Sequence, residues 1–290
     1  MKNILSILAI STIVLGMASC GGDEPEMNKV PEGAIKGVFT VGENTKVYFA
    51  KGNVQASYDG YGWKWAFADN QWDFIGNKAS NTSITGNSTI CSNGTVDMFG
   101  WSTERTYYGI HKSTNTSDYA GGFEDWGKNF GSGWRTPKID EWHYVFVQRE
   151  RAIELCGIGL VNNVKGIILL PDNWRKTPEG VPEFTPCDAG GMPIYQNGYY
   201  DKSFGDHYVD NKYTLREWIT MEDAGAVFLP ATSGRDGVEV GEEPDGRYWS
   251  ATKKGNSSAY AVGSSKYDIN AKGEADRYYG FAVRLICNTK

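Results

Sequence analysis

Alternating apolar and polar positions predict two β-hairpins near the start of the folded region. The first joins residues 38–41 to residues 46–50, and the second joins residues 53–58 to residues 63–67. An alternation of period two sends successive side chains to opposite faces of a strand, and a short polar turn separates the two arms of each hairpin. In the second hairpin this alternation gathers three rings on one face: Trp63, Trp65 and Phe67.

The stretch that begins at Thr136 predicts the main helix, which is expected to run to about Leu155. Thr136 is a favourable N-cap, and Pro137 suits the first helical position, where its missing N–H costs nothing. Acidic residues in the first turn complement the positive end of the helix dipole. Spacings of three and four predict one buried stripe: Ile139, Trp142, Val145, Phe146 and Ile153.

Short apolar runs predict further buried segments and strands along the rest of the chain. These runs are residues 96–101, 164–171, 226–230, 248–251, 259–262 and 279–286. Residues 218–224 predict a short second helix with Thr220 as its cap, and residues 77–96 and 172–217 are expected to be long surface loops. Short strands around one main helix indicate an α+β fold.

The first 34 residues have the features of an export signal and a tether. Lys2 precedes an apolar run that is too short to span a bilayer comfortably, so residues 1–19 are expected to be a signal peptide. Small residues lead to Cys20, which resembles the acylated cysteine of bacterial lipoproteins; the alternative is an ordinary signal peptide with an incidental cysteine. Residues 20–34 predict a flexible tether, and their acidic run resembles the surface-export tether of lipoproteins from Bacteroidetes-type bacteria. These features predict a lipid-anchored protein of the outer membrane that faces the exterior.

Composition narrows the class of ligand. The net charge of -6 argues against nucleic acid as a partner, since no basic stripe is present to neutralise phosphates. The 10 Trp and 17 Tyr among 290 residues suit a β-rich extracellular or carbohydrate-facing domain, although most of these rings are expected to be core.

Four cysteines remain after Cys20. In an exported protein they permit two disulfides in three connectivities, and buried free thiols are equally compatible with the sequence. They have no CxxC or CxxH spacing, so a zinc site is not expected. They are Cys91, Cys156, Cys187 and Cys287.

Eight short motifs occur in one order along residues 35–288. They are Lys46–Phe49 with Gly52-Asn53, Trp65–Ala68, Phe99–Trp101, Gly133–Pro137 with Glu141-Trp142, Lys165-Gly166 with Leu169–Pro171, Gly225–Pro230, Tyr248–Ser250 and Val283-Arg284. Together they resemble a family of exported bacterial domains related to the Fibrobacter succinogenes major paralogous domain. The resemblance implies a C-type-lectin-like domain over residues 35–290, with a twisted antiparallel β core, one main helix and long surface loops.

Six motif residues have an expected structural role, namely to lock loops onto the core. For Arg284, the sequence allows an ion pair with Asp140 or Glu141 and equally allows a solvent-facing side chain. The six are Trp134, Arg135, Pro137, Trp142, Trp249 and Arg284.

Catalysis is not expected. The C-type-lectin-like fold also underlies the formylglycine-generating enzymes, which need two closely placed reactive cysteines, and this family's paired-cysteine signature is absent here. The three histidines, at positions 111, 143 and 207, match no motif for hydrolysis.

A glycan or a host or matrix protein is the expected ligand, bound by the loops of residues 187–217 and 233–247. Rings in the first loop can stack on sugar faces while carboxylates order the hydroxyl groups, although the same rings can serve to cover the core of the loop. The predicted ligand-binding residues are Tyr195, Tyr199, Tyr200, Asp206 and Asp245.

Two further possibilities follow from the sequence. The triplet Glu243-Pro244-Asp245 resembles the Glu-Pro-Asn of carbohydrate-binding C-type lectins, which bind calcium, although no cofactor is expected because calcium needs six to eight converging oxygens. A structural role in surface assembly is the alternative to ligand binding, and exposed edge strands near residues 35–41 or 281–287 would favour it.

Overall fold

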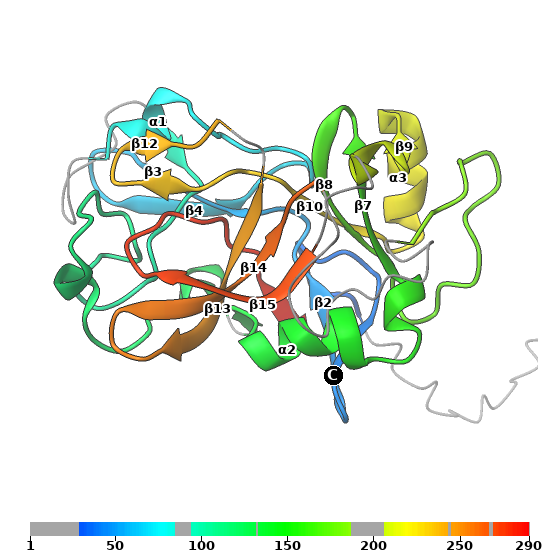
Figure 1. The fold of residues 1–290 in the computed structure, drawn as a ribbon, viewed down its shortest axis with the longest axis horizontal. Helices are drawn as coiled ribbons and strands as arrows, with labels where there is room; N and C mark the ends of the chain where they lie inside the picture. Colours follow the sequence, from blue (N-terminus) through cyan, green and yellow to red (C-terminus); the bar gives the residue numbers. More distant parts are fainter. Residues whose placement is uncertain are drawn as a thin grey trace, which may run out of the picture.

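A computed structural model describes residues 29–84, 94–131, 133–186, 206–242, 245–266 and 269–289. Within these residues the protein is α+β and mainly β, with short strands and few helices (Figure 1). The α+β fold class is therefore confirmed, while residues 1–28, which include the predicted signal peptide and Cys20, lie outside the described residues.

The strands are short. They are β1 (Phe39–Gly42), β2 (Thr45–Phe49), β3 (Val54–Tyr58), β4 (Trp63–Phe67), β5 (Thr95–Val96), β6 (Trp134–Arg135), β7 (Cys156–Val161), β8 (Val164–Leu169), β9 (Lys212–Tyr213), β10 (Val227–Pro230), β11 (Arg235–Asp236), β12 (Glu239–Val240), β13 (Gly246–Lys254), β14 (Ser258–Ser264), β15 (Ile269–Asp276) and β16 (Ile286–Asn288). The helical segments are α1 (Ala79–Thr82), η1 (Thr116–Tyr119), η2 (Trp126–Phe130), α2 (Ile139–His143), η3 (Tyr144–Gln148), η4 (Ala152–Glu154), η6 (His207–Val209) and α3 (Leu215–Asp223).

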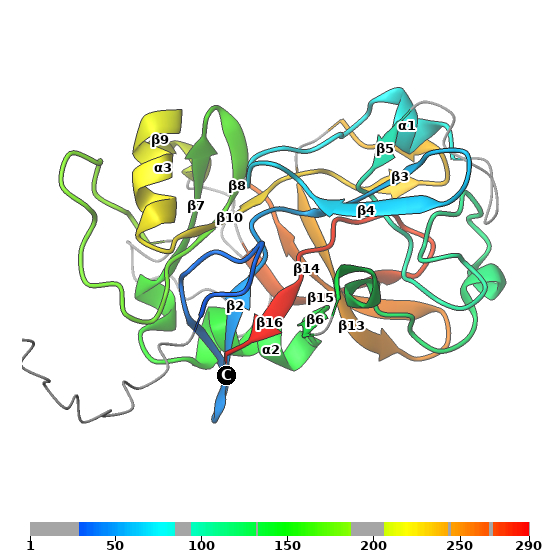
Figure 2. The ribbon, with the colours of Figure 1, turned by 180° about the vertical axis from the view of Figure 1, so that it is seen from behind.

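The strands pair into small sheets that are antiparallel apart from the β7–β9 pair. Figure 2 shows β16 between β2 and β6 in the sheet ordered β1-β2-β16-β6. The other sheets are ordered β10-β8-β7-β9, β13-β14-β15 and β4-β3-β5, with the separate pair β11-β12. Both predicted hairpins are confirmed as the pairs β1–β2 and β3–β4.

The main helix starts later and ends earlier than predicted. It comprises α2 and a π-helical continuation, η3, which ends at Gln148. Lys138 is the N-cap, and its N–H donates to the Glu141 carboxylate over 2.8 Å. Thr136 does not cap the helix because its N–H and hydroxyl both donate to the Asp125 carboxylate. The predicted stripe is buried as far as Phe146, whereas Ile153 is 44% exposed beyond the helix end.

The second helix also begins at a different residue. Thr214, and not Thr220, caps α3, and Glu217 completes a capping box by accepting a hydrogen bond from the Thr214 N–H. The Thr220 hydroxyl donates to the Arg216 carbonyl inside the helix. The helix therefore starts one turn before the predicted position.

Several strands lie where none was predicted, and one predicted strand is mostly absent. The unpredicted strands are β6, β7, β9, β11, β12 and β15. In β7 the glycines at 157 and 159 allow neighbouring residues to approach the strand closely. A Cβ at Gly159, for example, would lie 2.6 Å from the Asn211 Cβ. β15 is rich in charged and small residues and is held by its pairing with β14. Residues 279–285 form only isolated bridges, and β16 begins at Ile286.

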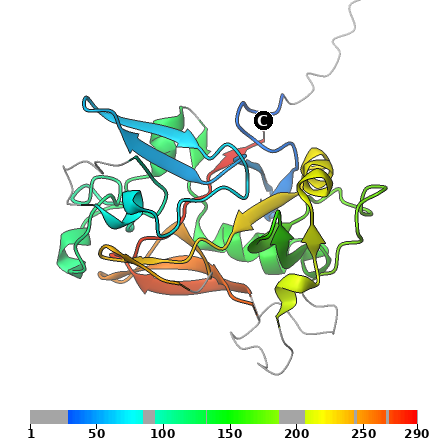
Figure 3. The same cartoon turned by 90° about the horizontal axis from the view of Figure 1, so that it is seen from above.

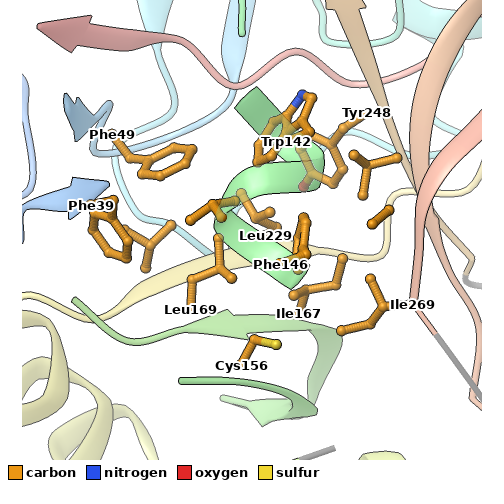
Figure 4. Packing of buried hydrophobic residues seen from close by; sticks show 14 of the residues in the cluster. Phe39, Phe49, Trp142, Phe146, Cys156, Ile167, Leu169, Leu229, Tyr248 and Ile269 are labelled. Carbon is orange, nitrogen blue, oxygen red and sulfur yellow. The ribbon is translucent and has the colours of Figure 1, made fainter. Parts of the chain in front are cut away.

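Three hydrophobic clusters fill the interior. In the first, Trp142 of α2 and Phe146 of η3 face Phe49, Leu169 and Leu229 from the neighbouring strands (Figure 4). The second lies between the β3–β5 and β13–β15 sheets, which Figure 3 shows on opposite sides of the molecule. The third lies beneath α3 and contains buried Trp218 and Met221.

Arg284 is fully buried, so the sequence-based alternatives for it are both wrong. Its guanidinium donates to the carbonyls of Ala50 and Phe228 over 3.0 and 2.9 Å and to the Asn53 amide oxygen over 2.9 Å. Glu141 pairs instead with Arg135, in a bidentate contact with two distances of 2.6 Å. Burial lowers the pKa of Arg284 to about 10, so the group remains charged at neutral pH.

The end of the predicted tether belongs to the folded part. Ala34 forms a β-bridge with Ala50, and the Lys51 N–H donates to the Gly33 carbonyl over 2.8 Å. Folded structure therefore starts at about residue 33. No helix within the described ranges is long and apolar enough to cross a membrane.

Arg284→Met is expected to lower the free energy of unfolding by about 3 kcal/mol or more, because two carbonyls and an amide oxygen lose a charged donor inside the core. Urea unfolding followed by tryptophan fluorescence measures the change. Arg216→Met, at an exposed position of α3, serves as the control and should stay within about 0.5 kcal/mol of the original protein. Similar losses in both variants would contradict the structural role given to Arg284.

Candidate functional site

Residues of the β11–β12 pair and of the β13–β15 sheet line a cleft of about 700 Å³, which we call the acidic cleft. Figure 1 shows β12 at the end of the molecule away from α3. Five carboxylate side chains line it: Asp236, Glu239, Glu242, Asp245 and Glu274. The region was predicted to be a solvated loop, and the structure shows instead a short hairpin at its centre.

The hairpin is held in place by Arg235. This side chain is fully buried, and its guanidinium donates to the carbonyls of His111, Met98 and Gly237. The Arg235 backbone also exchanges two hydrogen bonds with Gly280. A φ of 60° at Gly237 allows the two-residue turn that joins β11 to β12. Arg235 therefore fixes the β11–β12 hairpin, which forms one wall of the cleft, to the interior of the protein.

Two like charges stand opposite each other on this wall. Asp236 and Glu239 are direct cross-strand partners in the β11–β12 pair, and both are exposed. Like charges in such a pair are destabilising. The hairpin therefore presents negative charge to the cleft at some cost in stability.

Aromatic rings form the floor. The rings of Tyr279 and Phe281 are nearly parallel, with centroids 6.0 Å apart, and Phe281 packs on Trp249 at 4.5 Å. Phe281 is almost fully buried, so Tyr279 offers the accessible ring. A hydrogen bond with Tyr279, together with burial and nearby carboxylates, raises the pKa of Tyr278 to about 12, so the Tyr278 hydroxyl group is neutral at physiological pH.

The opposite wall carries both signs of charge. The Arg247 guanidinium lies 3.5 Å from the Asp245 carboxylate and 5.9 Å from the centre of the Phe281 ring. Glu274 forms an ion pair with Lys254. The charge on this wall is therefore largely balanced, in contrast to the hairpin wall.

A smaller pocket of about 190 Å³ adjoins the cleft and shares Asp245, Arg247 and Glu274 with it. Ser264 lines this pocket and is 5% exposed. Its hydroxyl has no hydrogen-bond partner among the described residues. The hydroxyl oxygen has almost no accessible surface, so a ligand group that enters the pocket does not reach it.

The arrangement suits a polar ligand with a ring. The accessible face of Tyr279 can stack on a sugar ring, and the surrounding carboxylates can accept hydrogen bonds from sugar hydroxyls. Within the described part of the chain, no three His, Cys, Asp or Glu side chains are placed to hold a metal ion.

The predicted ligand-binding residues do not gather at one place in the described structure. Asp245 lies in the acidic cleft, whereas Asp206 caps η6 by accepting from the Tyr208 N–H and lies 3.6 Å from Lys165. Tyr195, Tyr199 and Tyr200 lie outside the described residues.

The triplet that resembles a calcium ligand set is described only at Asp245, because residues 243 and 244 lie outside the described residues. The contact of Asp245 with Arg247 places a cation beside this carboxylate. Nothing in the described structure therefore adds support to a calcium site at this triplet.

Sequence reasoning missed Arg235, Arg247, Glu274 and Tyr279. The i, i+2 spacing of Tyr279 and Phe281 was a signal that both rings share one face, but that segment was assigned to the core. Nothing in the sequence showed that Glu274 would line the same cleft as the hairpin, because its position depends on the pairing of β14 with β15.

The described cysteines are buried. Cys156 and Cys287 are not joined to each other, and the Cys156 thiol donates to the Ala152 carbonyl over 3.4 Å. Burial raises the pKa of the Cys287 thiol. Cys91 and Cys187 lie outside the described residues.

Glu239→Gln is expected to raise the free energy of unfolding by about 0.2–1 kcal/mol, because it removes the repulsion from Asp236 across the hairpin. The gain should be larger at low salt than at 0.5 M salt, since screening weakens the repulsion. Urea unfolding at both salt concentrations measures it. Glu274→Gln is the control within the same cleft and should bring no gain, because that carboxylate pairs with Lys254; equal effects of the two changes would argue against the repulsion.

Comparisons of the chain with protein-family models, curated proteins and solved structures find no match. The resemblance of its motifs to a family of exported domains therefore remains a prediction. The function of the acidic cleft is inferred below from its own residues.

Proposed function

We propose that this protein is a surface-exposed bacterial lipoprotein whose folded part is a non-catalytic binding module, and that the acidic cleft binds a glycan. The observation that carries the proposal is the accessible Tyr279 ring at the floor of a polar cleft of about 700 Å³. Ligand sites in proteins commonly have volumes of 300–1,000 Å³ and combine aromatic surface with a few polar groups.

The position of the polar groups supports a sugar as the ligand. Asp245, Arg247 and Glu274 line both the cleft and the adjoining pocket, so a ligand of two or more rings can reach both spaces. Charged groups at the rim of an aromatic floor can each form a hydrogen bond with a sugar hydroxyl group, which fixes the orientation of the sugar ring.

A binding role also agrees with the state of the described thiols. An oxidase of the formylglycine-generating kind would need a reactive thiolate, and a raised pKa disfavours the thiolate of Cys287. The Cys156 thiol is buried in the first hydrophobic cluster. This oxidase activity is therefore the less favoured hypothesis.

A C-type-lectin-like fold of the kind found in the Fibrobacter-related family is part of the proposal. It rests on the motif residues and on their contacts: Trp142 and Trp249 are fully buried, and Arg135 clamps the first turn of α2 through Glu141. The Pro137 carbonyl accepts from the Ala251 N–H and so joins the start of the helix to β13. Trp134 packs edge-on against Phe67.

The assembly alternative is less favoured because its expected edges are occupied. β1 is the outer strand of its sheet, but the Asp172 carboxylate accepts from the Thr40 N–H and the Asp172 N–H donates to the Val38 carbonyl. β16 lies between two other strands. Neither strand offers the open edge that strand addition needs.

Tyr279→Ala is expected to weaken glycan binding about tenfold, because the accessible ring of the floor is lost. A glycan array probed with the purified protein, with and without calcium, identifies the glycan class, and titration calorimetry then measures the affinities. Tyr61→Ala, at a tyrosine that is 98% exposed on the β3–β4 turn, is the matched control and should bind normally. No binding to any glycan in either buffer would refute the glycan proposal.

Cys20→Ala is expected to release the protein from the membrane fraction, since acylation at this residue supplies the proposed anchor. Immunoblots of membrane and soluble fractions from an exporting bacterial host measure the distribution. Cys287→Ala should remain membrane-bound, and retention of the Cys20 variant would show that the anchor lies elsewhere.

A further inference from the structure

A second pocket, of about 430 Å³, shares no lining residue with the acidic cleft. Its lining comes from the β1–β2 hairpin, from residues in and after η3, and from the chain that follows β8. We call it the basic pocket. Four of its six charged lining residues are cations, in a chain whose net charge is -6. The six are Lys46, Arg149, Glu150, Arg151, Asp172 and Arg175.

The most buried charge of the pocket is Arg149, which is 4% exposed. Its guanidinium donates to three backbone carbonyls and, over 3.1 Å, to the Asp172 carboxylate. The same carboxylate accepts from the N–H and the hydroxyl of Thr40 over 2.8 and 2.6 Å. Asp172 is therefore engaged by the protein itself and does not balance the other cations of the pocket.

Two guanidinium groups converge on a single carbonyl at this pocket. Arg151 Nη1 and Arg175 Nη1 both donate to the Trp174 carbonyl, over 2.8 and 3.0 Å. Like charges held this close repel each other, and one carbonyl dipole offsets only part of the repulsion. Arg151 also pairs with Glu154, which does not line the pocket. An anion bound between the two guanidinium groups would remove the repulsion.

Several donors of these cations remain for such an anion. Among the residues that the structure describes, Arg175 Nε, Arg175 Nη2 and Arg151 Nη2 have no hydrogen-bond partner. Lys46 takes part in none of the ion pairs within the described ranges. Lys46 is the cross-strand partner of Thr40, so both side chains lie on one face of the β1–β2 hairpin. The donors therefore come from separate parts of the chain that line one pocket.

The arrangement suits a phosphate group better than a carboxylate. A phosphate presents several oxygens in a tetrahedral arrangement and can carry two negative charges, which matches cations from several directions. The planar fork of a guanidinium can also bind two phosphate oxygens at once. Glu150 is an exposed carboxylate on the same lining and opposes any anion, so its removal should strengthen binding.

We propose that the basic pocket binds a phosphate group through Lys46, Arg151 and Arg175. Arg149 contributes a fixed positive charge to the same lining. The site is separate from the acidic cleft, so this inference does not depend on glycan binding there. A soluble phosphate ester and the headgroup of a phospholipid present the same chemical group, and the test separates these two sources.

The test titrates glycerol 3-phosphate with the purified protein at pH 7.5 and low salt, and follows the phosphorus NMR signal. The original protein should shift this signal saturably. Arg175→Gln should weaken binding about fivefold, because one cation of the pocket is lost. Arg216→Gln, the same change at an exposed position of α3, is the matched control and should bind like the original protein.

Glu150→Gln should tighten binding about threefold, because it removes the opposing carboxylate. This variant distinguishes the pocket from damage to the fold, since a damaged protein would not gain affinity. In 0.5 M salt the differences among the variants should shrink.

Vesicles of phosphatidylcholine with phosphatidic acid identify the source. Release of bound glycerol 3-phosphate by these vesicles, and not by vesicles of phosphatidylcholine alone, would support the site and assign it to lipid headgroups. No release by either would support the site and assign it to soluble phosphate esters.

Two results would overturn the inference and leave the proposed glycan binding untouched. One is the absence of a saturable shift with the original protein. The other is equal binding by the original protein and by the Arg175 and Glu150 variants, which would show that the phosphate group does not bind in this pocket.

Discussion

Four buried arginine side chains hold the loop-rich parts of this protein together by donating to backbone carbonyls. They are Arg149, Arg235, Arg277 and Arg284. Long irregular connections leave carbonyl groups that no strand ladder satisfies, and a guanidinium offers five donors in a fixed plane. Arg284 illustrates the role, since its guanidinium joins Ala50, at the end of β2, to Phe228 in β10. Burial lowers the pKa of the Arg284 side chain, but the hydrogen bonds offset this cost.

The acidic cleft depends on one of these arginines. Arg235 anchors the β11–β12 hairpin to the chain around His111 and Gly280, while its neighbour Asp236 points its charge to solvent. The hydrogen bonds of Arg235 therefore stabilise the hairpin strongly enough for it to tolerate the unfavourable pair of Asp236 with Glu239 on its surface. Local instability that the surrounding structure tolerates is typical of sites that serve binding rather than folding.

Local patterns predicted many of the strands because period-two alternation is a property of the strand itself. The two hairpins lie where this pattern places them, and β10 lies in one of the short apolar runs that predict a buried strand. The limits of the helices were less predictable. At α2 a distant carboxylate, Asp125, takes both donors of Thr136 and removes it as a cap. At α3 the capping box is visible in the sequence as Thr214 with Glu217 three residues later, and it marks the start of the helix better than Thr220 does.

The sequence by itself determined the α+β class, most of the short strands and the buried stripe of the main helix, because each depends on neighbours a few residues apart. Only the tertiary structure decided that Arg284 is buried and that Tyr279, Glu274 and the β11–β12 hairpin meet in one cleft. The residues of that cleft are separated by tens of positions in the sequence and belong to different sheets. The order of the strands and the hydrogen bonds from buried arginines to carbonyl groups bring these residues together. Neither produces a periodic pattern in the sequence.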